Sequence, residues 1–165
     1  MPAMKTRQLA PIIGVVLIIS GCQMNDRSSS SAPDFTLSSI NGELYTRSKT
    51  NSKAMLVCFW AVGCGPCRME APPLNRLHEK YGPRGLKIFA INAWNEDREK
   101  VAAFVAEEKL KYPILMNGRQ VFRERYGGRT IPRNFVIDSR GMIVLDLDRW
   151  DETEIVTKVE ELLQS

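Results

Sequence analysis

A continuous apolar run from Met55 to Ala61 constrains the fold of this 165-residue chain more than any other feature of its sequence. Such a run, without alternating polar positions, is typical of a strand that is covered on both faces of a sheet. A second, largely apolar run follows at Leu86 to Ile91, and the intervening segment, Cys67 to Tyr81, carries apolar residues at helical spacing. Strand, helix and strand in this order predict an α/β fold with parallel strand pairs.

Shorter patterned segments extend the predicted sheet in both directions. Asp34 to Ile40 and Glu43 to Thr46 flank Asn41-Gly42, a dipeptide that suits the positive φ angles of a tight hairpin turn. Later segments predict a helix at Asp97 to Glu108, a strand at Tyr112 to Met116, a helix at about Gln120 to Tyr126, strands at Asn134 to Ile137 and Met142 to Leu147, and a helix at Glu152 to Leu163. We therefore expect one domain over residues 34–165, with a central mixed sheet flanked by helices and an N-terminal β-hairpin.

The first residues have the pattern of a secretion signal. Two basic residues precede an apolar stretch from Leu9 to Ile19, which is shorter than the roughly 20 residues of a membrane-spanning helix. Ile19-Ser20-Gly21-Cys22 closely resembles the bacterial lipobox, in which cleavage before the cysteine and acylation of its thiol leave a lipid-anchored protein. We expect a lipoprotein signal peptide at 1–21, a Ser-rich tether at 22–33, and a location facing the periplasm or the cell exterior. An ordinary signal peptide or an uncleaved anchor is the alternative.

Charge and ligand counts argue against two other classes of function. The 23 basic and 19 acidic residues form no polybasic run, so we expect no nucleic-acid partner. One histidine and four cysteines do not supply the ligand grouping of a zinc site, so we expect no metal and no other cofactor.

Reactive groups are concentrated in Trp60-Ala61-Val62-Gly63-Cys64-Gly65-Pro66-Cys67, where the buried strand ends and the helix begins. Free N–H groups and the positive end of the helix dipole stabilise a thiolate, so Cys64 is the predicted nucleophile. Cys67 lies one helical turn later and can form a disulfide with Cys64 or resolve a mixed disulfide. Pro66 suits the first turn, where its missing N–H is not needed.

Two other interpretations of these cysteines remain open. The first is a static structural disulfide, although a two-residue loop closes too little chain to add much stability. The second is a peroxidatic cysteine, because Ala32-Pro33-Asp34-Phe35-Thr36-Leu37 resembles the opening of peroxiredoxins. Peroxiredoxins, however, carry a Thr or Ser three residues before the reactive cysteine and no adjacent Cys-Gly-Pro-Cys.

Together the motifs resemble the TlpA/ResA-like group of membrane-anchored, thioredoxin-fold thiol-disulfide oxidoreductases. The resemblance covers Ala32 to the C-terminus and depends on Phe59-Trp60-Ala61, Cys64-Gly65-Pro66-Cys67-Arg68, Glu70 with Pro72 or Pro73 behind it, Ile131-Pro132, and Phe135-Val136-Ile137-Asp138 before Gly141. It implies a thioredoxin-like fold with an inserted βα element around Val101 to Val105. It also implies that Pro132 is cis and faces the disulfide, and that the substrate is contacted by Trp60, Gly63, Gly65, Pro66, Ile131 and Pro132.

The chain departs from this group at two positions near the cysteines. Gly63 stands where members usually have Trp, which removes an aromatic face from the rim of the site. Cys58 stands where related strands carry a buried Asp or Asn, so the usual buried proton acceptor is missing. Glu70 matches an acidic residue of the group and is the predicted proton acceptor for the resolving thiol. A helix-start glutamate that only complements the dipole is the alternative.

The resemblance also implies partners. We expect protein disulfides as substrates, with apocytochrome c among the candidates, and a membrane thiol donor that regenerates the dithiol of a monomeric protein. Reduction is the expected direction. A thiol peroxidase and a non-catalytic thioredoxin-like binding module are the competing functions.

Overall fold

The computed structural model describes residues 30–165. The signal peptide, Cys22 and most of the tether expected from the sequence fall on residues 1–29, outside the described residues. In chain order the elements are β1 (Thr36–Ser38), β2 (Leu44–Thr46), η1 (Arg47–Lys49), β3 (Ala54–Trp60), α1 (Gly65–Tyr81), η2 (Gly82–Arg84), β4 (Leu86–Asn92), α2 (Arg98–Glu107), β5 (Ile114–Leu115), η3 (Val121–Arg125), β6 (Arg133–Asp138), β7 (Ile143–Leu147) and α3 (Glu152–Gln164).

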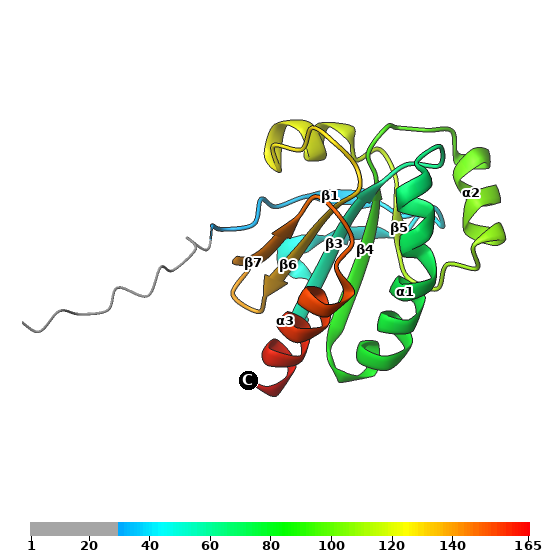
Figure 1. The fold of residues 1–165 in the computed structure, drawn as a ribbon. Coiled ribbons are helices and arrows are strands. Elements are labelled where there is room, and N and C mark those ends of the chain that lie inside the picture. The colour runs from blue at the N-terminus through cyan, green and yellow to red at the C-terminus, as the bar shows by residue number, and fades with distance from the viewer. Residues whose placement is uncertain (1–29) are drawn as a thin grey trace, which may run out of the picture.

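A five-stranded sheet in the order β5-β4-β3-β6-β7 forms the centre of the fold (Figure 1). The apolar strand β3 is its middle strand, parallel to β4 and antiparallel to β6. The outer strand β5 is parallel to β4, and β7 is antiparallel to β6. The predicted mixed sheet is therefore confirmed, and β3 is covered on both faces, as its continuous apolar sequence requires.

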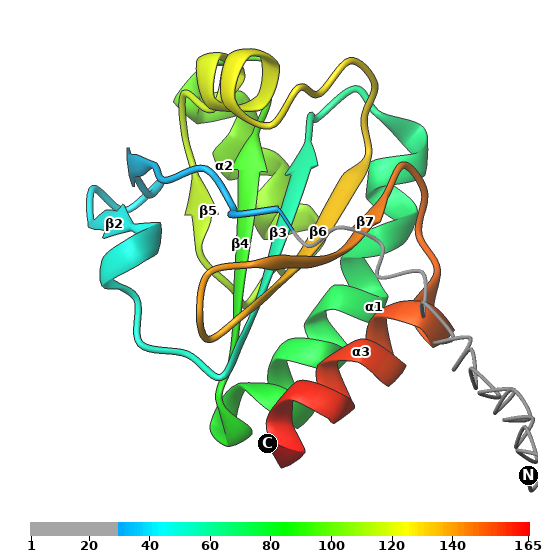
Figure 2. The same ribbon diagram turned by 90° about the vertical axis from the view of Figure 1, so that its left-hand side faces the viewer.

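Alternate residues of β3 face two separate cores. Leu56, Cys58 and Trp60 point to the face covered by α1, α2 and α3, whereas Val57 and Phe59 point to the face covered by the β1–β2 hairpin and η3. The two views of the ribbon show the helices on one side of the sheet and the hairpin on the other (Figures 1 and 2). This period of two is the ordinary geometry of a strand.

The predicted hairpin is confirmed, with shorter strands than its sequence suggested. Strands β1 and β2 pair antiparallel, and Gly42 has a φ of 88° in the turn between them. Residues 38–40 of the hairpin lie along the outer edge of β5. The Ile40 N–H donates to the Ile114 carbonyl at 2.8 Å, and the Met116 N–H donates to the Ser38 carbonyl at 2.8 Å. β5 itself has two residues, whereas the sequence predicted a strand of five, from Tyr112 to Met116.

The folded contacts begin earlier than the predicted tether boundary at residue 33. The Ala32 N–H donates to the Gly141 carbonyl at 2.8 Å, and the Ile143 N–H donates to the Ser30 carbonyl at 2.8 Å. Ala32 is also buried in the core on the hairpin side. Residues 30–33 therefore belong to the domain, because their backbone groups pair with the turn between β6 and β7.

Two glycines allow close packing around η3, Gly118 against β4 and Gly128 against η3 itself. A Cβ on Gly118 would lie 2.1 Å from Cγ2 of Ile91, and a Cβ on Gly128 would lie 1.9 Å from the Phe122 ring. The predicted helix at about Gln120 to Tyr126 is present as the single π-type turn η3.

None of the helices in residues 30–165 combines the length and the apolar character that a membrane span needs.

Candidate active site

Cys64 and Cys67 form a disulfide where the central strand β3 leads into α1. Their sulfur atoms are 2.03 Å apart, and their Cα atoms are 5.2 Å apart. Cys64 is half-buried, whereas Cys67 is only 5% exposed. Of the two sulfur-bearing side chains, an external thiol or disulfide can therefore reach Cys64 more readily.

The start of α1 is built around Cys64. Cys64 is the N-cap residue, and its Sγ accepts a hydrogen bond from the Cys67 N–H at 3.2 Å. Pro66 occupies the first turn, where a backbone N–H would have no helical partner. In the reduced protein, this N–H donor and the helix dipole would stabilise a thiolate on Cys64, as a helix N-terminus does for other low-pKa thiols.

A carboxylate that the sequence did not point to holds the loop before Cys64. Oε2 of Glu96 accepts hydrogen bonds from the Val62 N–H at 2.9 Å and from Nδ2 of Asn92 at 2.7 Å. Oδ1 of Asn92 in turn accepts from the Glu96 N–H at 3.1 Å. Asn92 is fully buried. A polar residue at the end of an otherwise apolar strand was the one available signal, because a buried amide needs partners.

The Ile131–Pro132 peptide bond is cis, as the resemblance implied. β6 begins at the next residue, and Arg133 pairs with Phe59 in β3. The cis proline therefore lies at the end of β3 from which the cysteine loop departs. Ile131 is half-buried and packs against both cores.

A buried polar group lies on the helix side of the sheet, behind the disulfide. Glu70 is 2% exposed and accepts a hydrogen bond at 3.2 Å from Nδ2 of Asn134, which lies opposite Cys58 in the β3–β6 pair. Burial raises the pKa of Glu70 to about 7, and the Asn134 hydrogen bond opposes this rise. Cys67 and Glu70 are three residues apart on α1, so they share one face of the helix.

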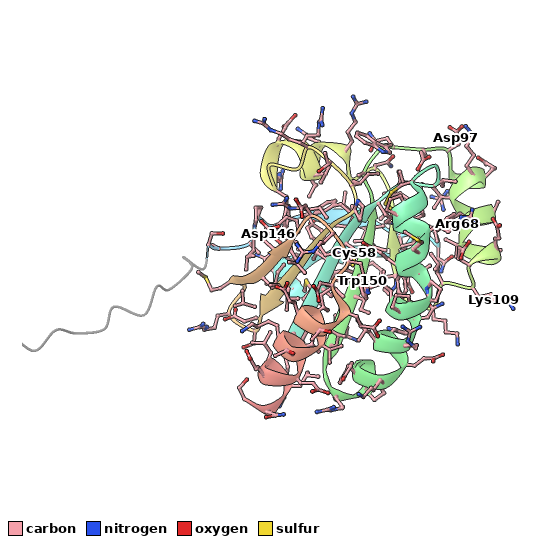
Figure 3. The ribbon with its side chains drawn as sticks, in the orientation of Figure 1. Cys58, Arg68, Asp97, Lys109, Asp146 and Trp150 are labelled. Atoms are coloured by element: carbon pink, nitrogen blue, oxygen red, sulfur yellow. A yellow bond between two sulfur atoms is a disulfide. The ribbon has the colours of Figure 1, made fainter. Side chains whose placement is uncertain are left out.

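Cys58 and Tyr112 complete this buried group. Burial raises the pKa of the Cys58 thiol well above its ordinary value, and the Glu70 charge adds to the rise. Burial also raises the pKa of Tyr112, with smaller contributions from Cys58 and Glu70. Cys58 lies in the interior among apolar neighbours (Figure 3). A thiol whose pKa is raised in this way stays protonated at neutral pH and cannot accept a further proton, so Glu70 is the better proton acceptor of the group.

The structure corrects the expected role of Trp60. Its side chain is 5% exposed and stacks on Phe104 of α2, with ring centroids 4.8 Å apart. The ring is therefore part of the core on the helix side of the sheet and offers almost no surface to a substrate. Of the other predicted contact residues, Gly63, Gly65 and Pro66 are exposed, Ile131 is half-buried and Pro132 is buried.

The positions of Gly63 and Gly65, on either side of Cys64, have room for a side chain. A Cβ at Gly63 or Gly65 would meet no heavy atom within 4 Å, and neither residue has a positive φ.

No cluster of three or more His, Cys, Asp or Glu side chains within residues 30–165 is arranged to bind a metal ion.

Known proteins similar to this chain are named as thiol-disulfide oxidoreductases or as thioredoxin-like. The ResA thiol-disulfide oxidoreductase of Geobacillus thermodenitrificans is 32% identical over 114 residues, which are 69% of this chain and 65% of that protein. The thioredoxin-like protein YneN of Bacillus subtilis is 31% identical over 114 residues, which are 68% of this chain and 66% of that protein. The chain thus spans about two thirds of the length of these curated relatives.

Solved structures confirm the predicted thioredoxin-like fold. A thiol:disulfide interchange protein from Bacteroides sp. has a TM-score of 0.73 and 24% identity, covering 84% of this chain and 91% of that one. The thioredoxin domain of a thiol-disulfide oxidoreductase from Bacteroides vulgatus has a TM-score of 0.72 and 24% identity, covering 82% and 98%. The sequence profile of the AhpC/TSA family matches residues 29–145. With that match over most of its length, the chain belongs to the AhpC/TSA family, and it resembles the ResA-like thiol-disulfide oxidoreductases.

Proposed function

We propose that this protein is a thiol-disulfide oxidoreductase that reduces protein disulfides. The observation that carries the proposal is the asymmetry of the cysteine pair, in which a half-buried, helix-capping Cys64 is bonded to a buried Cys67. The cis Pro132 lies at the same end of β3. The names of the relatives support the same reaction type.

The reaction exchanges one disulfide for another in two steps. The Cys64 thiolate attacks a substrate disulfide, forms a mixed disulfide, and displaces one substrate thiolate, which takes a proton from water. Cys67 then loses its proton and attacks Sγ of Cys64, which breaks the mixed disulfide and releases the second substrate thiolate. Two electrons have passed from the Cys64–Cys67 dithiol to the substrate, and the protein is left in the disulfide state seen here.

Glu70 is the proposed proton acceptor for Cys67. A carboxyl group with a pKa of about 7 is present in both protonation states at neutral pH, so it can accept a proton and release it again. Asn134 suits both states, because its Nδ2 donates to the carboxylate, while a rotated amide would accept from the carboxylic acid.

The cellular setting of the proposal follows from the sequence and the resemblance. Cleavage before Cys22 and lipidation of its thiol would anchor the monomer to a bacterial membrane on the extracytoplasmic side. A membrane thiol donor would regenerate the dithiol, and protein disulfides, including that of apocytochrome c, are the proposed substrates.

The deciding experiment follows disulfide reduction by the full-length chain after its own disulfide has been reduced. Wild-type protein should reduce a disulfide-bonded protein substrate stoichiometrically, and the Cys64→Ser/Cys67→Ser variant should not. Equal and negligible activity of both proteins would identify a non-catalytic binding module. Peroxide consumption that depends on Cys64 and exceeds disulfide reduction would identify a thiol peroxidase instead. The equilibrium of the Cys64–Cys67 pair with glutathione then gives the direction of electron flow.

A further inference from the structure

An arginine-rich surface adjoins the cis-proline end of the sheet. Arg119, Arg123 and Arg129 lie on η3 and on the chain segments that flank it, and all three side chains are exposed. We call these three residues the arginine face. No carboxylate of residues 30–165 forms a salt bridge with any of them. The nearby Glu124 is bound by Nε2 of Gln120 at 3.0 Å.

Two other arginines, Arg68 and Arg133, are paired with carboxylates. Arg68 on α1 forms salt bridges with Glu107 and Glu108 beside α2, and Arg133 forms one with Asp146 at 2.6 Å. Figure 3 shows Arg68 on the α2 side of the molecule and Asp146 on β7, away from α2. Arg98 and Arg125 also have no carboxylate partner within the described part of the chain, but their guanidinium groups donate to the backbone carbonyls of Ile40 and Asp34. The arginine face therefore adds three exposed guanidinium groups without carboxylate partners among residues 30–165 to the positive charge of this region.

The arginine face is joined to the end of β4 by specific contacts. The Gly118 N–H donates to the Asn92 carbonyl at 2.9 Å, and the Arg119 N–H donates to Oδ1 of Asn95 at 3.1 Å. Nη1 of Arg123 donates to the Arg129 carbonyl at 3.3 Å, two residues before Ile131. These hydrogen bonds connect the segment that carries the arginines to the loop after β4 on one side and to the loop that leads to Pro132 on the other.

An aromatic side chain and a hollow complete this surface. Trp94 is 38% exposed, its ring packs edge-on against Phe122 with centroids 6.5 Å apart, and the Arg123 guanidinium lies 5.9 Å from its centroid. A surface pocket of about 340 Å³ is lined by Asn95, Arg119, Gln120, Arg123 and Glu124. An exposed tryptophan beside arginines is the composition of a protein-binding hot spot.

We propose that the arginine face and Trp94 bind an acidic segment of the substrate polypeptide that flanks its reactive cysteine. The inference rests on the proposed function, because it names the class of substrate that the cysteine site receives. Unpaired guanidinium groups attract carboxylates, and their closeness to the cis-proline loop would bring a neighbouring substrate disulfide to Cys64.

The kinetic experiment uses three synthetic peptides with one internal disulfide, flanked by glutamates, glutamines or lysines. At low ionic strength, the reduced full-length wild-type chain should prefer the acidic over the basic peptide, and Arg119→Glu/Arg123→Glu should lower this rate ratio about tenfold. Comparing the ratio between protein variants cancels the intrinsic reactivity of the peptides. The preference should fade near 1 M salt, where the Debye length is about 3 Å.

Two matched variants test whether local charge is the cause. Arg84→Glu makes the same charge change per residue at the opposite end of the sheet, just before β4, and should leave the ratio unchanged. Arg119→Lys/Arg123→Lys keeps the charge and should retain most of the preference. A ratio that survives Arg119→Glu/Arg123→Glu, or one that Arg84→Glu lowers equally, overturns the proposal.

A binding measurement separates this inference from the proposed function. The oxidised chain should bind a glutamate-rich peptide without cysteines, with a change in tryptophan fluorescence that is lost in Arg119→Glu/Arg123→Glu and in Trp94→Ala. Binding without any peptide reduction would refute the proposed function and support the arginine face as a docking surface. Reduction without charge preference or binding would refute the docking surface alone. If the arginines affect only binding to vesicles of anionic lipid, the occupant is a membrane and the proposal is wrong.

Discussion

The two active-site thiols have different surroundings, and single substitutions should separate their roles. With Cys67→Ser, the half-buried Cys64 can still attack a substrate, but no thiol resolves the product, so mixed disulfides should accumulate. Cys64→Ser should trap far fewer, because Cys67 is only 5% exposed. Non-reducing gels with mass spectrometry of the trapped species measure both. The reverse pattern would exchange the two assignments.

Glu70 makes a pH-dependent contribution to stability whose sign follows from its pKa. Because burial raises that pKa from 4.5 to about 7, the folded chain keeps a proton that the unfolded chain has lost in this pH range. The contribution of Glu70 to the free energy of unfolding is therefore fully present below about pH 4.5. It decreases as the pH rises toward 7, by roughly 3 kcal/mol in total. Urea unfolding of the oxidised protein should show this loss in wild type and a flatter profile in Glu70→Gln.

The same substitution should slow resolution of the mixed disulfide, because glutamine cannot accept the Cys67 proton. Thiol alkylation against pH and the lifetime of the mixed disulfide measure the effect, and Glu99→Gln, on the exposed surface of α2, serves as the control. If neither quantity changes in Glu70→Gln, the carboxyl group takes no part in proton transfer and only its effect on stability remains.

At the scale of elements, the loop before α1 depends on a carboxylate from the loop after β4. Glu96→Ala removes the acceptor of the Val62 N–H and of the Asn92 amide, so we expect a loss of about 1–3 kcal/mol in unfolding free energy. Amide hydrogen exchange at Val62 should accelerate more than exchange within β3. Glu96→Gln keeps a carbonyl acceptor and should restore part of the protection. Unchanged Val62 exchange in Glu96→Ala would mean that the loop is held by other contacts.

At the scale of the whole molecule, membrane attachment and chemistry should be separable. Cys22 lies outside the described residues, whereas every group of the cysteine site lies in the folded domain. Cys22→Ser should therefore leave disulfide exchange intact and release soluble or unprocessed protein from the membrane fraction. Mass spectrometry of the mature N-terminus is the direct measurement, and an unmodified Cys22 thiol there would disprove the lipid anchor.

Short-range patterns in the sequence determined the order of the elements and the position of the reactive pair. The apolar run of β3, the helical spacing of α1 and the Asn41-Gly42 turn act over a few residues, so local reasoning recovers them. The Cys64–Cys67 pair was visible for the same reason, because both thiols lie within one helical turn.

Only the tertiary structure decided which distant side chains meet. Glu96 reaches Val62 across 34 positions of sequence, and Asn134 reaches Glu70 across 64, through the packing of strands and loops that no local pattern encodes. Trp60 was predicted to contact the substrate, but its ring is buried because it packs against Phe104 of α2. These contacts depend on which faces of the sheet are covered and by what, and that is a property of the assembled core.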